Sequence, residues 1–155
     1  MTVRMANKFD IPRMLELGYN ACLHRGHGSV ASILNMDTET SWQDSPRKIF
    51  AQILAGAGLI FLYESNNKVE GILMAMRSPS MWDHTKYAMY NQAIWIEAGH
   101  RGDGAGNELI QAYIEACNKL KEEKQIMYYT MSIDADLQMD LSKVGFHKFE
   151  QVWAR

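Results

Sequence analysis

Apolar and polar residues along the chain alternate with two different periods. Segments rich in aromatic and β-branched residues predict strands, and apolar positions three and four residues apart predict helices. The predicted strands cover residues 2–6, 59–64, 69–76, 90–96, 125–133 and 146–153. The predicted helices cover residues 11–24, 47–54, a long stretch after residue 104, and 136–143, with a further short helix over 30–36 as an alternative to a polar loop.

The order of these elements restricts the fold. The strands over 59–64 and 69–76 are joined by the polar turn Ser65–Lys68, which predicts an antiparallel hairpin. The strand, helix and strand between residues 90 and 133 should form a right-handed parallel crossover. We therefore expect an α/β fold, with a mixed, mostly antiparallel central sheet and helices on both faces. No repeat, low-complexity stretch or linker interrupts the chain, so residues 1–155 should form one domain.

A glycine-rich turn lies between the strand at 90–96 and the long helix. Three of the five residues Gly102–Gly106 are glycine, and Arg101 precedes them. Glycine permits a tight turn and brings backbone N–H groups close to a ligand. The first N–H groups of the following helix have no internal partner, and the helix dipole places partial positive charge there. The turn therefore predicts a phosphate site, unless it is only a glycine-rich connection.

Two common phosphate motifs do not fit this turn. A dinucleotide-binding G-x-G-x-x-G that starts at Gly102 would need its third glycine at Asn107, and one that starts at Gly104 would need it at Leu109. A nucleotide-triphosphate loop would need Lys and Ser or Thr after Gly106. The residues Arg101–Gly106 do match Q/R-x-x-G-x-G/A, the coenzyme A pyrophosphate loop of the GNAT superfamily of N-acetyltransferases.

The resemblance to this superfamily extends over essentially the whole chain. The segment Val3–Pro12 looks like the family's first strand and helix entry, and Leu141–Phe146 resembles its closing Y-E-K-x-G-F signature. The compact, methionine-rich sequence also resembles GNAT proteins encoded by bacteriophages. The resemblance implies a GNAT-like fold and an acetyl-CoA-dependent transfer of an acetyl group to a small-molecule or protein amine.

The resemblance also assigns cofactor contacts. The pyrophosphate of acetyl-CoA is expected on the turn, and the pantetheine arm along the end of the preceding strand, paired with its backbone. The N–H near Ile96 would polarise the thioester carbonyl. The strand 125–133 would splay from the cofactor strand. The expected contact residues are Trp95, Ile96, Glu97, Arg101, Gly102, Asp103, Gly104, Ala105, Gly106 and Asn107.

The family's usual catalytic groups are missing. Tyr90 stands where a glutamate commonly acts as base, and Leu141 stands where a tyrosine commonly acts as acid. By strand alternation Tyr90 and Gln92 should share a face with Ile94 and Ile96, where they could hold a water or donate a hydrogen bond.

Other side chains are alternatives to the missing groups. Glu97 is the nearest carboxylate, but alternation places it on the opposite face from Ile96 unless a bulge intervenes. Tyr128 and Tyr129 on the next strand are alternatives for the acid. The second hypothesis is therefore a catalytically silent GNAT-like module with a structural or regulatory binding role.

Composition excludes several other classes. A net charge of −2 gives no reason to expect nucleic acid, and the uncharged apolar run Ile53–Tyr63 is too short to span a membrane. The N-terminus has no apolar core of a signal peptide, and Cys22 and Cys117 are expected as thiols, which predicts a cytoplasmic protein.

The remaining polar clusters give weaker signals. His24 and His27 have metal-ligand spacing, but Gly26 breaks the helix and no third ligand is near, so no metal is expected. The acidic loop around Asp37, Glu39 and Asp44 borders the acceptor side of the resembled fold, which suggests a cationic amine or simply a solvated loop. Exposed strand edges allow a homodimer.

Overall fold

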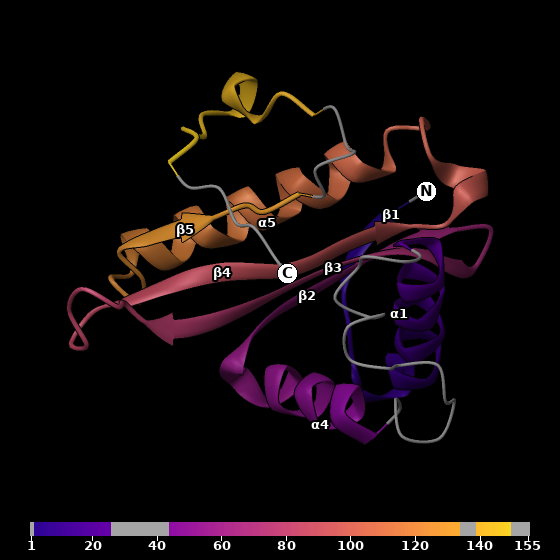
Figure 1. Ribbon diagram of the computed structural model, residues 1–155, viewed down its shortest axis with the longest axis horizontal. Coiled ribbons are helices and arrows are strands. Elements are labelled where there is room, and N and C mark those ends of the chain that lie inside the picture. The colour runs from indigo at the N-terminus through magenta and orange to yellow at the C-terminus, as the bar shows by residue number, and fades with distance from the viewer. Residues whose placement is uncertain (1, 26–43, 134–138, 150–155) are drawn as a thin grey trace.

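The computed structural model describes residues 2–25, 44–133 and 139–149. Its centre is a five-stranded sheet in which each strand lies beside its sequence neighbours, in the order β1-β2-β3-β4-β5. The strands are β1 (Thr2–Met5), β2 (Gly58–Ser65), β3 (Lys68–Pro79), β4 (Tyr87–Ile96) and β5 (Tyr128–Thr130). The first three pairings are antiparallel and β4 pairs β5 in parallel, as the sequence predicts (Figure 1).

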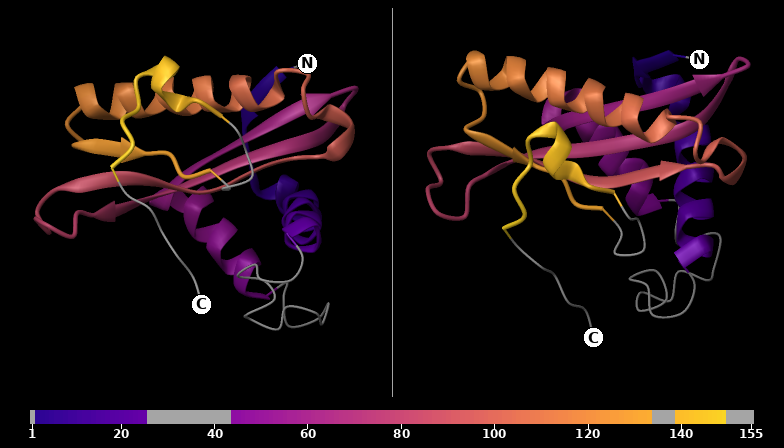
Figure 2. Two further views of the ribbon diagram at one scale, coloured as in Figure 1. Left: turned by 45° about the horizontal axis from the view of Figure 1, so that its top comes forward. Right: turned by 90° about the horizontal axis from the view of Figure 1, so that it is seen from above.

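Helices cover both faces of the sheet, which confirms the predicted arrangement. Helices α1 (Ile11–Arg25) and α4 (Asp44–Gln52) lie on one face, and α5 (Ala105–Glu122) lies on the other (Figures 1 and 2). Each face has its own core. The α5 face buries Phe61, Tyr63, Leu73, Ala75, Met89, Ile94, Leu109, Tyr113 and Cys117, among others. The opposite face buries Met14, Leu17, Phe50, Ile53, Ile60, Leu62, Ile72 and Trp95, among others.

The hairpin between β2 and β3 turns tightly, as predicted. Its two central residues, Asn66 and Asn67, both have positive φ angles, of 52° and 60°. This is the backbone of a type I′ turn, which matches the right-handed twist of the strands that it joins. Asparagine tolerates this conformation better than most residues do.

The entry to α1 is capped by Asn7. Asn7 caps a 3₁₀ turn over Lys8–Asp10 that runs into α1. The Asn7 side chain accepts from the Phe9 N–H, and the Asp10 carboxylate accepts from the Asn7 N–H. Asp10 also accepts two hydrogen bonds from Arg4, which lower the pKa of its carboxyl group.

A bulge in β4 changes which side chains share a face. Asn91 pairs Ala75 and Ala93 pairs Met74, so Gln92 is the extra residue without a partner on β3. The expectation that Tyr90 shares a face with Ile94 and Ile96 is therefore wrong, and Gln92, placed with them by the same alternation, is the bulge residue itself. Tyr90 pairs Met76, which packs in the core beside α1 and α4, whereas Ile94 belongs to the α5 core.

The C-terminal part has less regular structure than the sequence predicts. The strand expected over 125–133 is limited to β5. Residues 136–138 of the helix expected over 136–143 lie outside the described residues, and the described part of that segment has a 3₁₀ turn at Leu141–Val144. Residues 146–149, expected to begin a strand, have no regular structure. The rest of that strand and the alternative helix at 30–36 lie outside the described residues. In the described part of the chain no helix has the length and apolarity to cross a membrane.

Candidate functional site

The glycine-rich turn joins the end of β4 to the start of α5. After a 3₁₀ turn at Ala98–His100, Gly102 and Gly104 have φ angles of 92° and 87°. A side chain is strained in this left-handed region, so both positions favour glycine. A Cβ atom built on either residue would meet no atom within 4 Å. The turn is therefore open on its outer side, where a ligand can approach the backbone.

The N-terminus of α5 presents unpaired N–H groups beside this turn. Gly104 is the N-cap, and the Glu108 N–H makes the first bond of the helix, to the Gly104 carbonyl. The N–H groups of Ala105, Gly106 and Asn107 precede that bond and have no partner within the helix. Together with the helix dipole they are suited to bind an anion. A Cβ atom at Gly106 would come within 3.2 Å of the Ile96 Cδ1, so glycine there lets α5 pack closely on β4.

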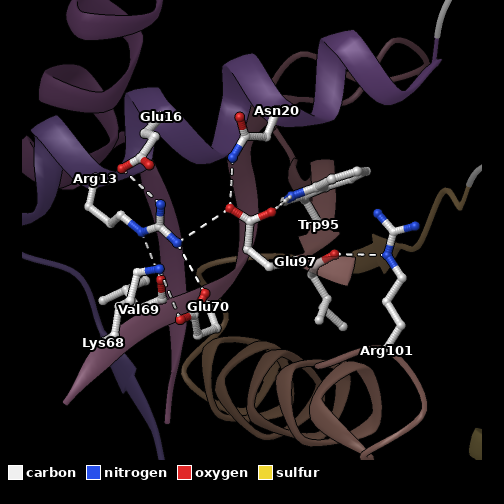
Figure 3. Close-up of polar contacts among 10 residues, drawn as sticks. Arg13, Glu16, Asn20, Lys68, Val69, Glu70, Trp95, Glu97 and Arg101 are labelled. Carbon is white, nitrogen blue, oxygen red and sulfur yellow. Dashed lines mark hydrogen bonds and ion pairs between the residues drawn. The ribbon is translucent and has the colours of Figure 1, made fainter. Parts of the chain in front are cut away.

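Arg101 is exposed, and its side chain contacts the end of β4. Its Nε donates to the Ile96 carbonyl at 2.9 Å, and its Cζ lies 4.4 Å from the centre of the Trp95 ring (Figure 3). Its Nη1 is 3.4 Å from His24 Nε2 on α1. The positive charge predicted at this turn is thus held at the junction of the turn, β4 and α1.

The backbone of β4 has one edge that β3 does not use. The Glu97 N–H donates to the Glu70 carbonyl of β3 at 2.9 Å. Because backbone groups alternate in direction along an antiparallel strand, the N–H and C=O groups of Ile94 and Ile96 point away from β3, toward the β5 side. In the described part of the chain β5 pairs β4 only at Ala88–Tyr90. An extended ligand can therefore pair with β4 at Ile94 and Ile96.

Asn91 lies where β5 separates from β4. Its side chain is buried, its Nδ2 donates to the Ser132 carbonyl at 2.8 Å, and its Oδ1 accepts from the Ser132 N–H. The amide thus makes the two hydrogen bonds that a neighbouring strand would make. The separation of the two strands, which the resemblance predicted, is thus fixed by a specific side chain.

Glu97 ties α1 to the end of β4. One of its carboxylate oxygens accepts from Asn20 Nδ2 at 2.8 Å and lies 3.3 Å from Arg13 Nη2. The other oxygen accepts from Trp95 Nε1 at 3.4 Å (Figure 3). Arg13 also binds the Glu70 carboxylate and the Val69 carbonyl. The carboxylate lies on the face opposite Ile96, as alternation predicts, and three donors surround it.

The candidate catalytic side chains fall on different faces of the sheet. The Tyr90 hydroxyl lies 2.7 Å from the Tyr128 hydroxyl, on the α1 and α4 face. Tyr129 points to the α5 face, where its hydroxyl donates to Asn118 Oδ1 and burial raises its pKa. Leu141 packs against the α5 core. Gln92, at the bulge, is exposed, and its amide donates to the Tyr90 carbonyl.

The histidines considered as metal ligands and the acidic loop considered for the acceptor lie partly outside the described residues. His24 packs against Trp95, with ring centres 5.3 Å apart, and His27 is not among the described residues. Within residues 2–25, 44–133 and 139–149, no three His, Cys, Asp or Glu side chains gather as a metal site. Asp37 and Glu39 of the acidic loop are not described, and Asp44 begins α4.

Sequence reasoning did not identify three polar residues of this region: Arg13, Asn20 and Asn91. The first two lie on α1, and their partners Glu70 and Glu97 are more than 50 residues away in the sequence, so no local pattern marks these contacts. Asn91 does carry a signal, because asparagine is depleted in strand interiors. A buried asparagine between strand-forming residues indicates a place where strand pairing changes.

Known proteins resemble the chain both in sequence and in structure. The model of the acetyltransferase (GNAT) family matches residues 28–139. Among curated protein sequences none matches. A solved structure described as a predicted acetyltransferase with acetyl-CoA, from Clostridium acetobutylicum, has a TM-score of 0.70 at 16% identity and covers 99% of this chain and 94% of its own.

Two further solved structures are similar over nearly the whole chain. An aminoglycoside acetyltransferase from an uncultured soil metagenomic sample, in complex with sisomicin, has a TM-score of 0.66 at 18% identity and covers 99% of this chain and 93% of its own. An integron cassette protein from the mobile metagenome of Cole Harbour salt marsh has a TM-score of 0.71 at 17% identity, with 99% and 88% covered. At these identities the likeness shows the fold.

Proposed function

Since the chain belongs to the acetyltransferase (GNAT) family, we propose that it transfers the acetyl group of acetyl-CoA directly to an amine. One observation carries this proposal: an edge of β4 that no described strand pairs leads directly into a turn suited to bind an anion. An extended ligand with a pyrophosphate at one end and amide groups along its length can bind both together. Acetyl-CoA is such a ligand, and GNAT acetyltransferases use it.

We assign the cofactor contacts according to these two features. The turn from Arg101 through Gly102, Asp103 and Gly104 to the first N–H groups of α5 at Ala105, Gly106 and Asn107 would hold the pyrophosphate. The β4 segment Trp95–Glu97 would hold the pantetheine arm by backbone pairing, mainly through Ile96. Because Arg101 Nε bonds to the Ile96 carbonyl, that side chain would move aside when the arm pairs there.

Among the three candidate catalytic residues, Tyr90 has the best-supported position. It lies at the place where β5 separates, next to a second hydroxyl. Glu97 has its carboxylate surrounded by Arg13, Asn20 and Trp95, so we assign it mainly to positioning β4. Gln92 is exposed at the bulge and could hold the acceptor or a water.

The acceptor is proposed as an amine, either a small molecule or a protein. A structural neighbour is an aminoglycoside acetyltransferase in complex with sisomicin, which supports testing polyamines and aminoglycosides first. The single domain over residues 1–155, a cytoplasmic location, a homodimer, and the absence of a metal and of nucleic-acid or membrane partners remain predictions from the sequence.

The second candidate function is a silent module that binds coenzyme A or a protein. The absence of a carboxylate at Tyr90 and of a hydroxyl at Leu141 favours it. The two functions differ in a thiol-release assay with acetyl-CoA and separate pools of polyamines, aminoglycosides, amino acids and peptides, followed by mass spectrometry of the amine. An acetylated amine formed faster than without protein supports the enzyme. Cofactor binding without any acetylated amine supports the module.

A further inference from the structure

Two tyrosine hydroxyls form a pair at the place where β5 separates from β4. We propose that Tyr90 and Tyr128 together carry the proton between the acceptor amine and the departing thiolate. This assignment rests on the proposed function and makes it more specific. Leu141 stands where a tyrosine commonly acts as acid and has no hydroxyl. The proposal therefore assigns the proton transfer to two hydroxyls on β4 and β5.

The geometry of the pair is well defined. The two oxygens are 2.7 Å apart, and the rings meet edge to face, with centres 6.0 Å apart and planes at 88°. Ala88 pairs Tyr128 and Tyr90 pairs Thr130, so the two tyrosines lie at opposite ends of the short stretch over which β4 and β5 pair. Both tyrosines are half-buried. The rings are therefore held by packing and by their mutual hydrogen bond.

The bulge at Gln92 determines the direction of Tyr90. Without the bulge Tyr90 would point to the α5 face together with Ile94, because the two residues would be separated by an even number of positions. With the bulge it points to the α1 and α4 face, the side to which Tyr128 also points. The Tyr90–Tyr128 hydroxyl pair therefore depends on the bulge at Gln92, which shifts the register of β4 against β3.

The pair is also at the correct end of the cofactor edge. The glycine-rich turn is at the C-terminal end of β4, beyond Ile96, whereas Tyr90 lies in the N-terminal half of β4 and Tyr128 lies on β5, opposite Ala88. A cofactor that runs from the turn along Ile96 and Ile94 approaches Tyr90 with its acetyl end. Asn91, which spans to Ser132, prevents it from extending farther between the strands. The reacting atoms would thus lie beside the hydroxyls.

A hydrogen-bonded hydroxyl pair suits this proton transfer. One hydroxyl donates to the other, so the accepting hydroxyl keeps its own proton for a third group. In the reaction the acceptor nitrogen forms a bond to the acetyl carbon, and the carbon–sulfur bond breaks. One hydroxyl gives its proton to the thiolate sulfur, the second hydroxyl passes its proton to the first, and the amine nitrogen gives its proton to the second. The net change is one proton moved from nitrogen to sulfur.

The test uses Tyr90→Phe, Tyr128→Phe and the double variant, with Tyr129→Phe as the matched control. Tyr129 is on the same strand as Tyr128, but its hydroxyl binds Asn118 on the other face. We expect each single change to lower kcat by about 100-fold, with unchanged KM and unchanged calorimetric affinity for acetyl-CoA. The kcat of the double variant should be no lower than that of the less active single variant, because the two hydroxyls act as a unit. Tyr129→Phe should keep its kcat.

Unchanged kcat in either single variant, or additive losses in the double variant, would overturn the assignment while the proposed function stands. Acetyl-CoA binding without transfer by the parent protein to any amine would overturn both. A second measurement does not depend on turnover. With tyrosine labelled with ¹³C at Cζ, the Tyr90 and Tyr128 resonances should differ between the coenzyme A and acetyl-CoA complexes, and the Tyr129 resonance should not. Identical Tyr90 and Tyr128 resonances in the two complexes would contradict the proposed position of the acetyl group.

Discussion

The side chain of Asn91 binds the backbone of Ser132 through both its donor and its acceptor, 41 residues away in the sequence. It takes the place of a strand at the point where β4 and β5 separate. Two adjacent strands that separate to admit a ligand lose the hydrogen bonds between their backbone N–H and C=O groups, which is unfavourable unless other groups replace them. The Asn91 amide thus allows the strands to part at a defined residue.

Replacing Asn91 should therefore destabilise the protein. In Asn91→Ala two hydrogen bonds from a buried amide are lost, and we expect the free energy of unfolding to fall by about 2 kcal/mol. Urea unfolding of the variant and the parent measures this difference. Gln92→Ala, at the adjacent exposed position, is the control and should change the value by less than about 0.5 kcal/mol. Equal effects of the two changes would contradict the role given to Asn91.

Glu97 should matter more for stability than its partial exposure suggests. In Glu97→Ala the side chains of Asn20 and Trp95 lose their acceptor and Arg13 loses one carboxylate. We expect the free energy of unfolding to fall by about 2 kcal/mol, and Glu97→Gln, which keeps an acceptor oxygen, to cost roughly half as much. Chemical denaturation at neutral pH measures both.

Glu16 provides the matched control for Glu97, because it binds the same Arg13 but is largely exposed. Glu16→Gln should change the free energy of unfolding by less than about 0.5 kcal/mol. If it costs as much as Glu97→Ala, the stabilisation comes from the net charge around Arg13 and not from the contacts of Glu97.

The glycine turn shows how far local sequence rules go. The Arg101–Gly106 motif predicts both the bend and the helix start, because positive φ angles and an open N-terminus depend on neighbouring residues only. The partners of Arg101 could not be predicted in this way. Its contacts with Trp95 and His24 depend on how α1 packs on the sheet.

The sequence failed where distant segments decide the outcome. The bulge at Gln92 depends on the register of β4 against β3, and no residue in β4 marks it, so the face of Tyr90 was assigned incorrectly. The strand predicted over 125–133 is limited to Tyr128–Thr130. Beyond Thr130 the backbone no longer pairs with β4, and at Ser132 it binds the Asn91 side chain instead. Predicting a strand from its sequence pattern assumes that its backbone pairs without interruption, whereas the Asn91 side chain replaces the backbone pairing of β4 with β5 at Ser132.

Gly104 should be replaceable only at a cost in stability. Its φ angle of 87° is strained for any other residue, although a Cβ atom would meet no neighbour. Gly104→Ala should therefore lower the free energy of unfolding by about 1 kcal/mol. Thermal unfolding tests this, and an unchanged midpoint would mean that the turn can adopt another backbone conformation.

Cys117 should be unreactive in the folded protein. Burial raises the pKa of its thiol to about 12, so the nucleophilic thiolate is scarce at pH 8. In a Cys22→Ser background, a disulfide reagent should react with Cys117 only after unfolding. Rapid modification of the native protein at pH 8 would contradict the burial.

The raised pKa of Cys117 also predicts a pH dependence of stability. Between about pH 8.5, where the unfolded thiol ionises, and about pH 12, the folded thiol keeps a proton that the unfolded chain releases. The free energy of unfolding should therefore fall as pH rises, by at most about 1.4 kcal/mol per pH unit from this group. Burial also raises the pKa of Tyr113, which acts in the same direction at higher pH. The Cys117→Ala variant should show a smaller slope in alkaline denaturation, and an unchanged slope would assign the effect to other groups.

The turn at the start of α5 should bind the pyrophosphate of acetyl-CoA. The most direct test is a calorimetric titration of the parent, Asn107→Asp and Gln111→Glu with acetyl-CoA. Both changes add one negative charge to an exposed position of α5, and a carboxylate in the first turn favours the helix, so folding is preserved. We expect the parent to bind, Asn107→Asp to bind about ten-fold more weakly, a difference of about 1.4 kcal/mol, and Gln111→Glu to bind as the parent does. No binding by the parent, or equal binding by Asn107→Asp, would contradict the claim.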